Sequence, residues 1–82
     1  MTKRLTKKYQ PTPELDLHGI QHHAVSVLVE DFVLNNQNKF PLKIITGNSE
    51  KMKSIVISVL NQHEFNYLNG DYYNRGYIDV LN

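Results

Sequence analysis

Two amphipathic helical patterns, each preceded by a short β-like segment, constrain the fold of this chain more than any other feature. The first pattern spans residues 20–36, where pairs of apolar residues recur every four positions. Those apolar residues are Ala24, Val25, Leu28, Val29, Phe32 and Val33. The second pattern begins after Ser49, a good N-cap that is followed by an acidic residue, and ends near His63. Its apolar residues are Met52, Ile55, Val56, Val59 and Leu60.

Four β-like segments complete the order of elements. Residues 14–18 alternate polar and apolar side chains, and residues 40–46 end in β-branched residues, with Pro41 at the beginning, where no ladder donor is needed. Residues 65–68 and 77–81 are separated by turn signals, which predicts an antiparallel hairpin with residues 69–76 as its loop. With 82 residues the chain makes one domain. The order β-α-β-α-β-β predicts a two-layer α/β fold, with both helices on one face of a four-stranded mixed sheet.

The charges are distributed unevenly along the chain. Residues 1–13 form a predicted tail, in which two prolines favour extended backbone and four of the first eight residues are basic. These residues are Lys3, Arg4, Lys7 and Lys8. Residues 9–82 hold five basic and eight acidic side chains, and we take residues 14–82 as the folded domain. The tail is interpreted either as a solvated arm or as an arm that contacts phosphates.

Composition excludes several classes of protein. The chain has no cysteine, which excludes disulfides, thiolate zinc sites, iron–sulfur clusters and a cysteine nucleophile. No apolar run approaches the 18–20 residues of a membrane span, and no apolar segment follows the basic residues at the start. We therefore expect a cytoplasmic protein without a membrane partner.

Two polar residues near the end of the first predicted strand are candidates for acid–base chemistry. Asp16 and His18 are two positions apart, so on a strand they point to the same face. A histidine can take or give a proton near neutral pH, and a neighbouring carboxylate can fix its tautomer. The alternative is that both belong to the solvated outer face of a two-layer fold and need no function.

The loop after the second predicted strand is a candidate phosphate site. Residues 46–49 read Thr-Gly-Asn-Ser and open the second helix, whose free N–H groups attract anions. If the first two strands are neighbours, this loop lies beside His18, since ligands of open α/β sheets bind at the carboxyl ends of parallel strands. The alternative is a plain strand-to-helix turn with a serine cap.

The other histidines and aromatic residues have weaker assignments. His22 and His23 follow His18 closely, and Asp16, His18 and His22 could approach one ion, but nothing in the spacing fixes a metal geometry, so we predict no metal ligands. His63 is predicted at the end of the second helix. Tyr72, Tyr73, Arg75 and Tyr77 surround the hairpin, where they could stack on unpaired bases or cover the sheet.

The segment Leu15-Asp16-Leu17-His18-Gly19 resembles the LDLHG motif of the Smr (small MutS-related) domain family. Ala24, the Ile45-Thr46-Gly47 segment and Gly76 with Val80 continue the resemblance, which covers residues 14–81. It implies a fold like the C-terminal domain of bacterial translation initiation factor three, with strand order 1-2-4-3 and an antiparallel last strand. It also implies binding of DNA or RNA, often with endonuclease activity.

The resemblance points to Asp16, His18, Thr46 and Gly47 as functional residues, and the charges and the loop chemistry add the others. Asp16 and His18 would be catalytic, with a divalent ion such as Mg²⁺ or Mn²⁺ as a compatible cofactor. The expected nucleic-acid contacts within the domain are Gly19, Thr46, Gly47, Asn48, Ser49, Lys51, Lys53, Arg75 and Gly76, and the tail would add Lys3, Arg4, Lys7 and Lys8. The chain departs from the family pattern at Ser49, which replaces the second glycine of the TGxG loop, and it lacks the His-Ser that often follows.

Three functions therefore remain open. The leading one is an endonuclease that cleaves a phosphodiester, and the second is a nucleic-acid-binding module without catalysis, which the altered glycine loop favours. The third is a protein-interaction domain, which the acidic balance of residues 9–82 favours. An uncovered sheet face or edge strand could also pair two copies as a homodimer.

Overall fold

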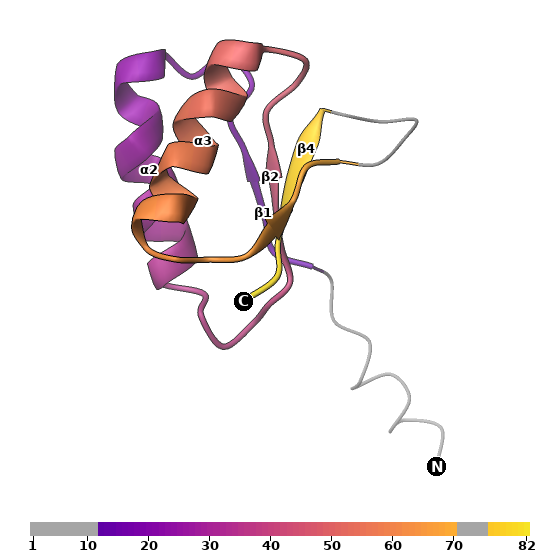
Figure 1. Cartoon of the computed structure of the whole chain (residues 1–82). Helices are drawn as coiled ribbons and strands as arrows, with labels where there is room; N and C mark the ends of the chain where they lie inside the picture. Colours follow the sequence, from indigo (N-terminus) through magenta and orange to yellow (C-terminus); the bar gives the residue numbers. More distant parts are fainter. Residues whose placement is uncertain (1–11, 71–75) are drawn as a thin grey trace.

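The computed structural model describes residues 12–70 and 76–82 and shows a two-layer α/β fold (Figure 1). Its elements are β1 (Glu14–Asp16), α2 (His22–Leu34), β2 (Leu42–Ile45), α3 (Glu50–Gln62), β3 (Tyr67–Leu68) and β4 (Tyr77–Val80). The strand order is β1-β2-β4-β3, and both helices cover the same face of the sheet. The predicted fold class, element order and strand order are confirmed.

The sheet is parallel only between its first two strands. Leu15 of β1 lies opposite Ile44 of β2, whereas β2 and β4 run antiparallel, with Ile44 opposite Ile78. The predicted hairpin is formed by β3 and β4, with Tyr67 opposite Val80. Because β1 and β2 run in the same direction, both end at the same edge of the sheet, as the sequence predicts.

The core lies between the sheet and the helices. The sheet contributes alternate residues that point toward the helices, and the helices contribute one buried face each. The fully buried side chains are Leu17, Val25, Val29, Val33, Leu42, Ile44, Val56, Leu60, Ile78 and Val80. The inward-facing residues of a strand alternate with outward-facing ones, and no described helix or strand covers the opposite face of the sheet (Figure 1).

The two helices bury different fractions of their apolar residues. In α2 the residues Val25, Val29 and Val33 are buried, whereas Val27 and Leu28 are exposed. In α3 the buried apolar residues are Met52, Val56, Val59 and Leu60.

The Ser49 hydroxyl caps α3 by accepting a hydrogen bond from the Met52 N–H at 3.1 Å. The predicted N-cap is therefore confirmed, and it satisfies one of the N–H groups that a helix start leaves unpaired.

Several predicted elements are longer than the observed ones. The strand expected over residues 14–18 ends at Asp16, and the strand expected over 40–46 covers Leu42–Ile45. The hairpin strands likewise cover two and four residues, and the first helix begins at His22 rather than residue 20. The expected strand ends form turns instead, with Gly19 and Gly47 at positive φ.

His63 ends α3, as predicted, and it also joins the two helices. It is the C-cap of α3, and its Nε2 lies 2.8 Å from Oε2 of Glu30 in α2. Within the described residues, no helix has both the length and the apolar composition to cross a membrane.

Candidate functional site

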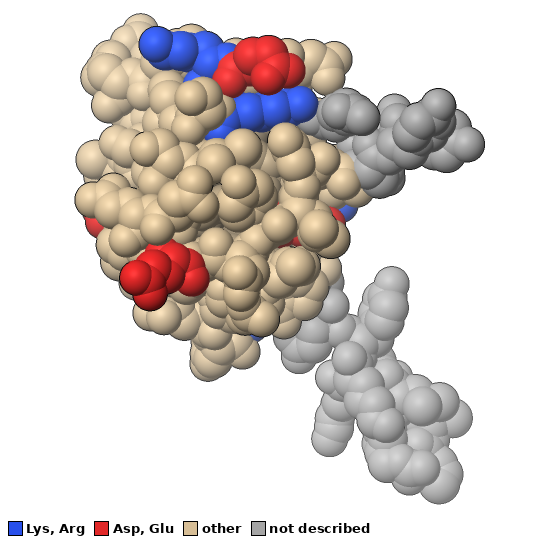
Figure 2. All heavy atoms as spheres, in the orientation of Figure 1, with Lys and Arg blue, Asp and Glu red and all other residues tan. Residues whose placement is uncertain are grey.

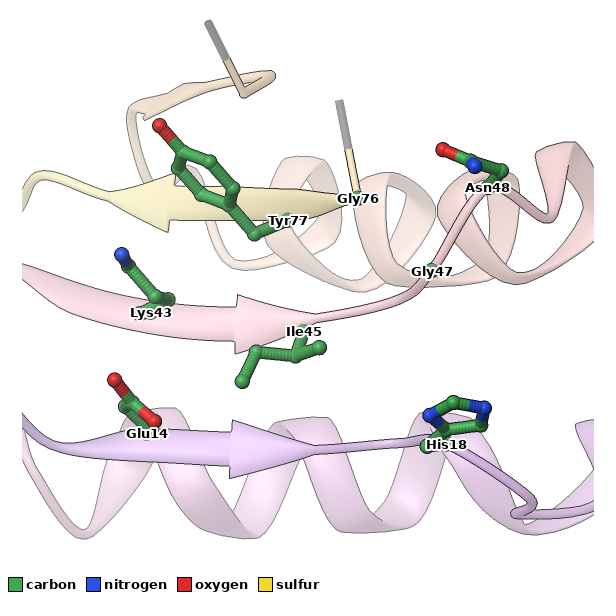
Figure 3. Close-up of a pocket in the computed structure, with 8 residues that line it drawn as sticks. All are labelled: Glu14, His18, Lys43, Ile45, Gly47, Asn48, Gly76 and Tyr77. Atoms are coloured by element: carbon green, nitrogen blue, oxygen red, sulfur yellow. The ribbon is translucent and has the colours of Figure 1, made fainter. Parts of the chain in front are cut away.

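An open hollow of about 460 Å³ lies on the uncovered face of the sheet, at the edge where β1 and β2 end (Figure 3). His18, Gly47, Asn48 and Gly76 line the end of the hollow at the strand exits, and Glu14, Lys43 and Tyr77 line the other end. Ile45 lies between the two groups. The hollow thus has polar groups at both ends and an apolar side chain in the middle.

A tight turn after β1 places His18 in the hollow. Oδ1 of Asp16 accepts a hydrogen bond from the backbone N–H of His18 at 2.9 Å, and the Ile20 N–H donates to the Leu17 carbonyl. An aspartate that accepts from the N–H two residues later forms an Asx turn. The predicted role of Asp16 in orienting the His18 imidazole is therefore not what the structure shows, because the carboxylate holds the backbone of His18 rather than its ring. Asp16 itself does not line the hollow.

The loop after β2 is tied to the start of β4. The N–H groups of Thr46 and Gly47 both donate to the carbonyl of Gly76, each at 2.9 Å. The Thr46 side chain is 4% exposed, and its hydroxyl donates to the Gly47 carbonyl. These groups are occupied, so Thr46 and the Gly47 N–H position the loop and do not present hydrogen-bond donors to the hollow.

The donors left for an anion belong to the next residues. None of the hydrogen bonds among the described residues uses the N–H groups of Asn48, Glu50 or Lys51. They lie at the N-terminus of α3, where the helix dipole favours negative charge. The Ser49 hydroxyl oxygen accepts from the Met52 N–H as the helix cap, and its O–H can still donate to a phosphate oxygen.

Two lysines of α3 accompany this helix start. Lys51 is exposed, and Lys53 is 6% exposed without an ion pair to any described residue. No described side chain has a fully buried nitrogen that lacks a hydrogen bond, so the Lys53 ammonium reaches the surface while its alkyl stem is covered. The basic groups visible in Figure 2 gather at the end of the molecule where α3 begins, beside an acidic group.

The part of the chain that the structure describes forms no metal site from its own side chains. Within residues 12–70 and 76–82, no three histidine, aspartate or glutamate side chains come together in a way that could hold a metal. This includes the combination of Asp16, His18 and His22 that their spacing in the sequence left open. One carboxylate oxygen of Asp16 is engaged by the backbone N–H of His18.

The structure thus brings together only part of the predicted set. His18, Gly47, Asn48 and Gly76 meet at one end of the hollow, whereas Gly19, Thr46, Ser49, Lys51 and Lys53 lie outside its lining. Five predicted contacts lie outside the described residues, namely Lys3, Arg4, Lys7, Lys8 and Arg75.

Three residues of the hollow were not predicted from the sequence. Glu14, Lys43 and Ile45 point to the uncovered face because they alternate with the buried residues of β1 and β2. The Lys43 Nζ lies 4.4 Å from the centre of the Tyr77 ring, a cation–π contact. Strand alternation alone could have placed all three on this face, but their meeting with Tyr77 depends on the register of β2 and β4.

No family model, curated protein or solved structure matches this chain.

Proposed function

We propose that this chain is a small Smr-like nucleic-acid-binding domain, in which His18 takes part in cleaving a phosphodiester. The observation that carries the proposal is the placement of two complementary groups at one edge of the sheet. The exposed His18 lies at the end of β1, and the unused N–H groups at the start of α3 lie beyond the end of β2, its paired neighbour. The first is an acid–base group and the second is an anion site.

The chemistry divides between the two junctions. The N–H groups of Asn48, Glu50 and Lys51 would hold phosphate oxygens, and the Lys51 ammonium would add sequence-independent attraction. The His18 imidazole would take the proton of the attacking hydroxyl or water, or return one to the leaving oxygen. Asp16 would act as a positioning residue, because its carboxylate fixes the backbone from which the imidazole projects. The partner in this proposal is DNA or RNA in the cytoplasm. The chain would bind it as a monomer or as a homodimer.

A second candidate is a nucleic-acid-binding module that does not cleave. The turn at Asp16 favours it, since the carboxylate bonds to the backbone and leaves the imidazole without an orienting partner among the described residues. The bonded state of the Thr46 and Gly47 N–H groups also favours it, because they offer a phosphate fewer donors than an open glycine loop would. The acidic balance outside the tail continues to support a protein partner as a third candidate.

A cleavage panel separates these candidates. Structured and single-stranded DNA and RNA are incubated with wild-type protein, with His18→Ala and with His23→Ala, each in Mg²⁺, in Mn²⁺ and in chelator. His23 is an exposed histidine outside the hollow, so its variant is a matched control. Product with wild type and His23→Ala, but at least a hundredfold less with His18→Ala, supports catalysis by His18. Equal cleavage by all three removes His18 from the mechanism.

Binding without product supports the module. In that case the slope of log affinity against log salt concentration counts the phosphates that the protein neutralises, and Lys51→Gln should reduce its magnitude by about one. Failure of every oligonucleotide to bind at low salt makes a protein partner the leading candidate.

A further inference from the structure

The charged side chains that β1, β2 and β4 place on the uncovered face of the sheet are acidic apart from one lysine. The strand register places the side chains of alternate residues on this face, namely Glu14, Asp16, Lys43, Ile45, Tyr77 and Asp79. Three of them are carboxylates and one is an ammonium. A phosphate backbone laid across this face would be repelled, whereas a nucleobase carries no charge and can occupy it.

The two ends of the hollow therefore suit different parts of a nucleotide. The strand exits offer His18 and the unused N–H group of Asn48, which suit the phosphate. The opposite end offers the Tyr77 ring with the Lys43 ammonium over it, and Ile45 lies between the ends, and these suit a flat, uncharged base (Figure 3). The volume of about 460 Å³ lies within the range of small-ligand sites.

Glu14 and Lys43 can read the edge of that base. They are direct partners in the register of β1 and β2, and both line the hollow, but no ion pair joins the carboxylate to the ammonium. The Watson–Crick edge of guanine has the oxygen O6 beside the donors N1–H and N2–H. Lys43 can donate to O6 while both oxygens of Glu14 accept from the two N–H groups. Each other base offers the carboxylate one N–H group on this edge, and a base-paired guanine offers none.

We propose that the hollow binds the base of one unpaired nucleotide and prefers guanine, with Glu14 and Lys43 reading its Watson–Crick edge and its phosphate held at the strand exits. This inference rests on the proposed function, and it specifies the form of nucleic acid that the same site takes. It assigns specificity to residues that the sequence patterns did not mark.

The test compares oligonucleotides that differ by one amino group. Eight-residue uridine strands carrying one central guanosine or one central inosine, and their deoxy counterparts, are titrated into the full chain at low salt by fluorescence anisotropy. Inosine lacks only the N2 amino group, so it keeps N1–H and loses one hydrogen bond to a charged acceptor. The guanosine strand should bind about tenfold more tightly than the inosine strand, and annealing it to its complement should weaken binding.

Variants of two glutamates locate the effect. Glu14→Gln offers one oxygen acceptor in place of two, so the difference between guanosine and inosine should disappear. Glu64→Gln, at an exposed glutamate after α3, should keep the full difference. In amide NMR spectra of the wild-type protein, the guanosine strand should shift the signals of Lys43 and Tyr77. A spectrum of the Glu14→Gln variant without ligand, with signals dispersed as in wild type, shows that the variant remains folded.

The outcomes distinguish this inference from the proposed function. Tight single-strand binding with equal affinity for guanosine and inosine overturns the base reading and leaves the proposed function standing. Tighter binding of the duplex than of the single strand overturns the assignment of an unpaired nucleotide. Absence of binding by any strand overturns the proposed function and this inference together.

Discussion

The two strand-to-helix junctions lie side by side at one edge of the sheet but are built differently. After β2, the loop is tied to Gly76 by two N–H groups, and the following helix is capped by Ser49. After β1, the turn is held by the Asp16 carboxylate, and the N-cap of α2 is Gln21, whose side chain caps nothing. The second junction thus uses the Thr46 and Ser49 hydroxyls in its own structure, whereas the first leaves the His18 side chain exposed.

The largest effect is expected at Leu17, the first residue after β1, and Thr46 at the same position after β2 is its comparison. Leu17 and Thr46 occupy this position at the two junctions and both are buried, but Leu17 packs in the core, whereas the Thr46 hydroxyl bonds to the loop. Leu17→Ala should lower the free energy of unfolding by about 2–5 kcal/mol through the cavity it leaves. Thr46→Val should cost about 1 kcal/mol, the value of one hydrogen bond. Urea denaturation measures both, and a larger loss for Thr46→Val would show that the second junction depends on its polar contacts more than on packing.

The two glycines should respond alike. Gly19 has φ +78° and Gly47 has φ +68°, and a Cβ added at either position would meet no heavy atom within 4 Å. Replacement by alanine therefore costs only the strain of left-handed backbone, about 1–2 kcal/mol at each site. Thermal or urea unfolding of Gly19→Ala and Gly47→Ala checks this. A clearly greater loss at Gly47 would mean that the bonds to Gly76 prevent the loop from relaxing.

Removing the cap of α3 should have a smaller effect. Ser49→Ala leaves the Met52 N–H without its acceptor and should cost about 1 kcal/mol in the free energy of unfolding. Ser54→Ala, at an exposed position inside the same helix, is the matched control and should be neutral or slightly stabilising. If the two variants unfold at the same urea concentration, the cap contributes nothing.

The smallest effect is expected from adding a cap to α2. Gln21 has the extended backbone of an N-cap, with φ −71° and ψ 144°, so Gln21→Ser places a hydroxyl where it can accept from the start of the helix. We expect a gain of about 0.5–1 kcal/mol. The matched control is Gln62→Ser, at the C-terminal end of α3, where a serine hydroxyl cannot cap a helix start and should give no gain. A stabilised Gln21→Ser protein that keeps its activity would show that the missing cap is not needed for function.

Much of the fold could be predicted from the sequence because its signals are local. The apolar spacing of Val25, Val29 and Val33 identifies α2, and Ser49 marks the start of α3. The early end of β1 also had a local signal, since Asp16 can form an Asx turn with His18, but the alternation of residues 14–18 outweighed it.

The candidate site depends on contacts that are distant in the sequence. The Gly76 carbonyl takes the N–H groups of Thr46 and Gly47, some thirty residues earlier, and this occupies donors that the loop sequence alone leaves free. The pairing of Lys43 with Glu14 and its contact with Tyr77 likewise require the register of three strands. Local patterns therefore identified the edge of the sheet where the site lies, but not which groups at that edge remain available.

The shared acceptor at Gly76 has a consequence for hydrogen exchange. Because the amide hydrogens of Thr46 and Gly47 depend on one carbonyl, a single separation of the start of β4 from the loop exposes both to solvent. Their exchange rates should follow the same opening equilibrium, while the amide of Asn48, which is not used in a hydrogen bond among the described residues, exchanges without it. The exchange rates of Thr46 and Gly47 thus report how often the start of β4 separates from the loop, and the unprotected amide of Asn48 gives the rate without protection for comparison.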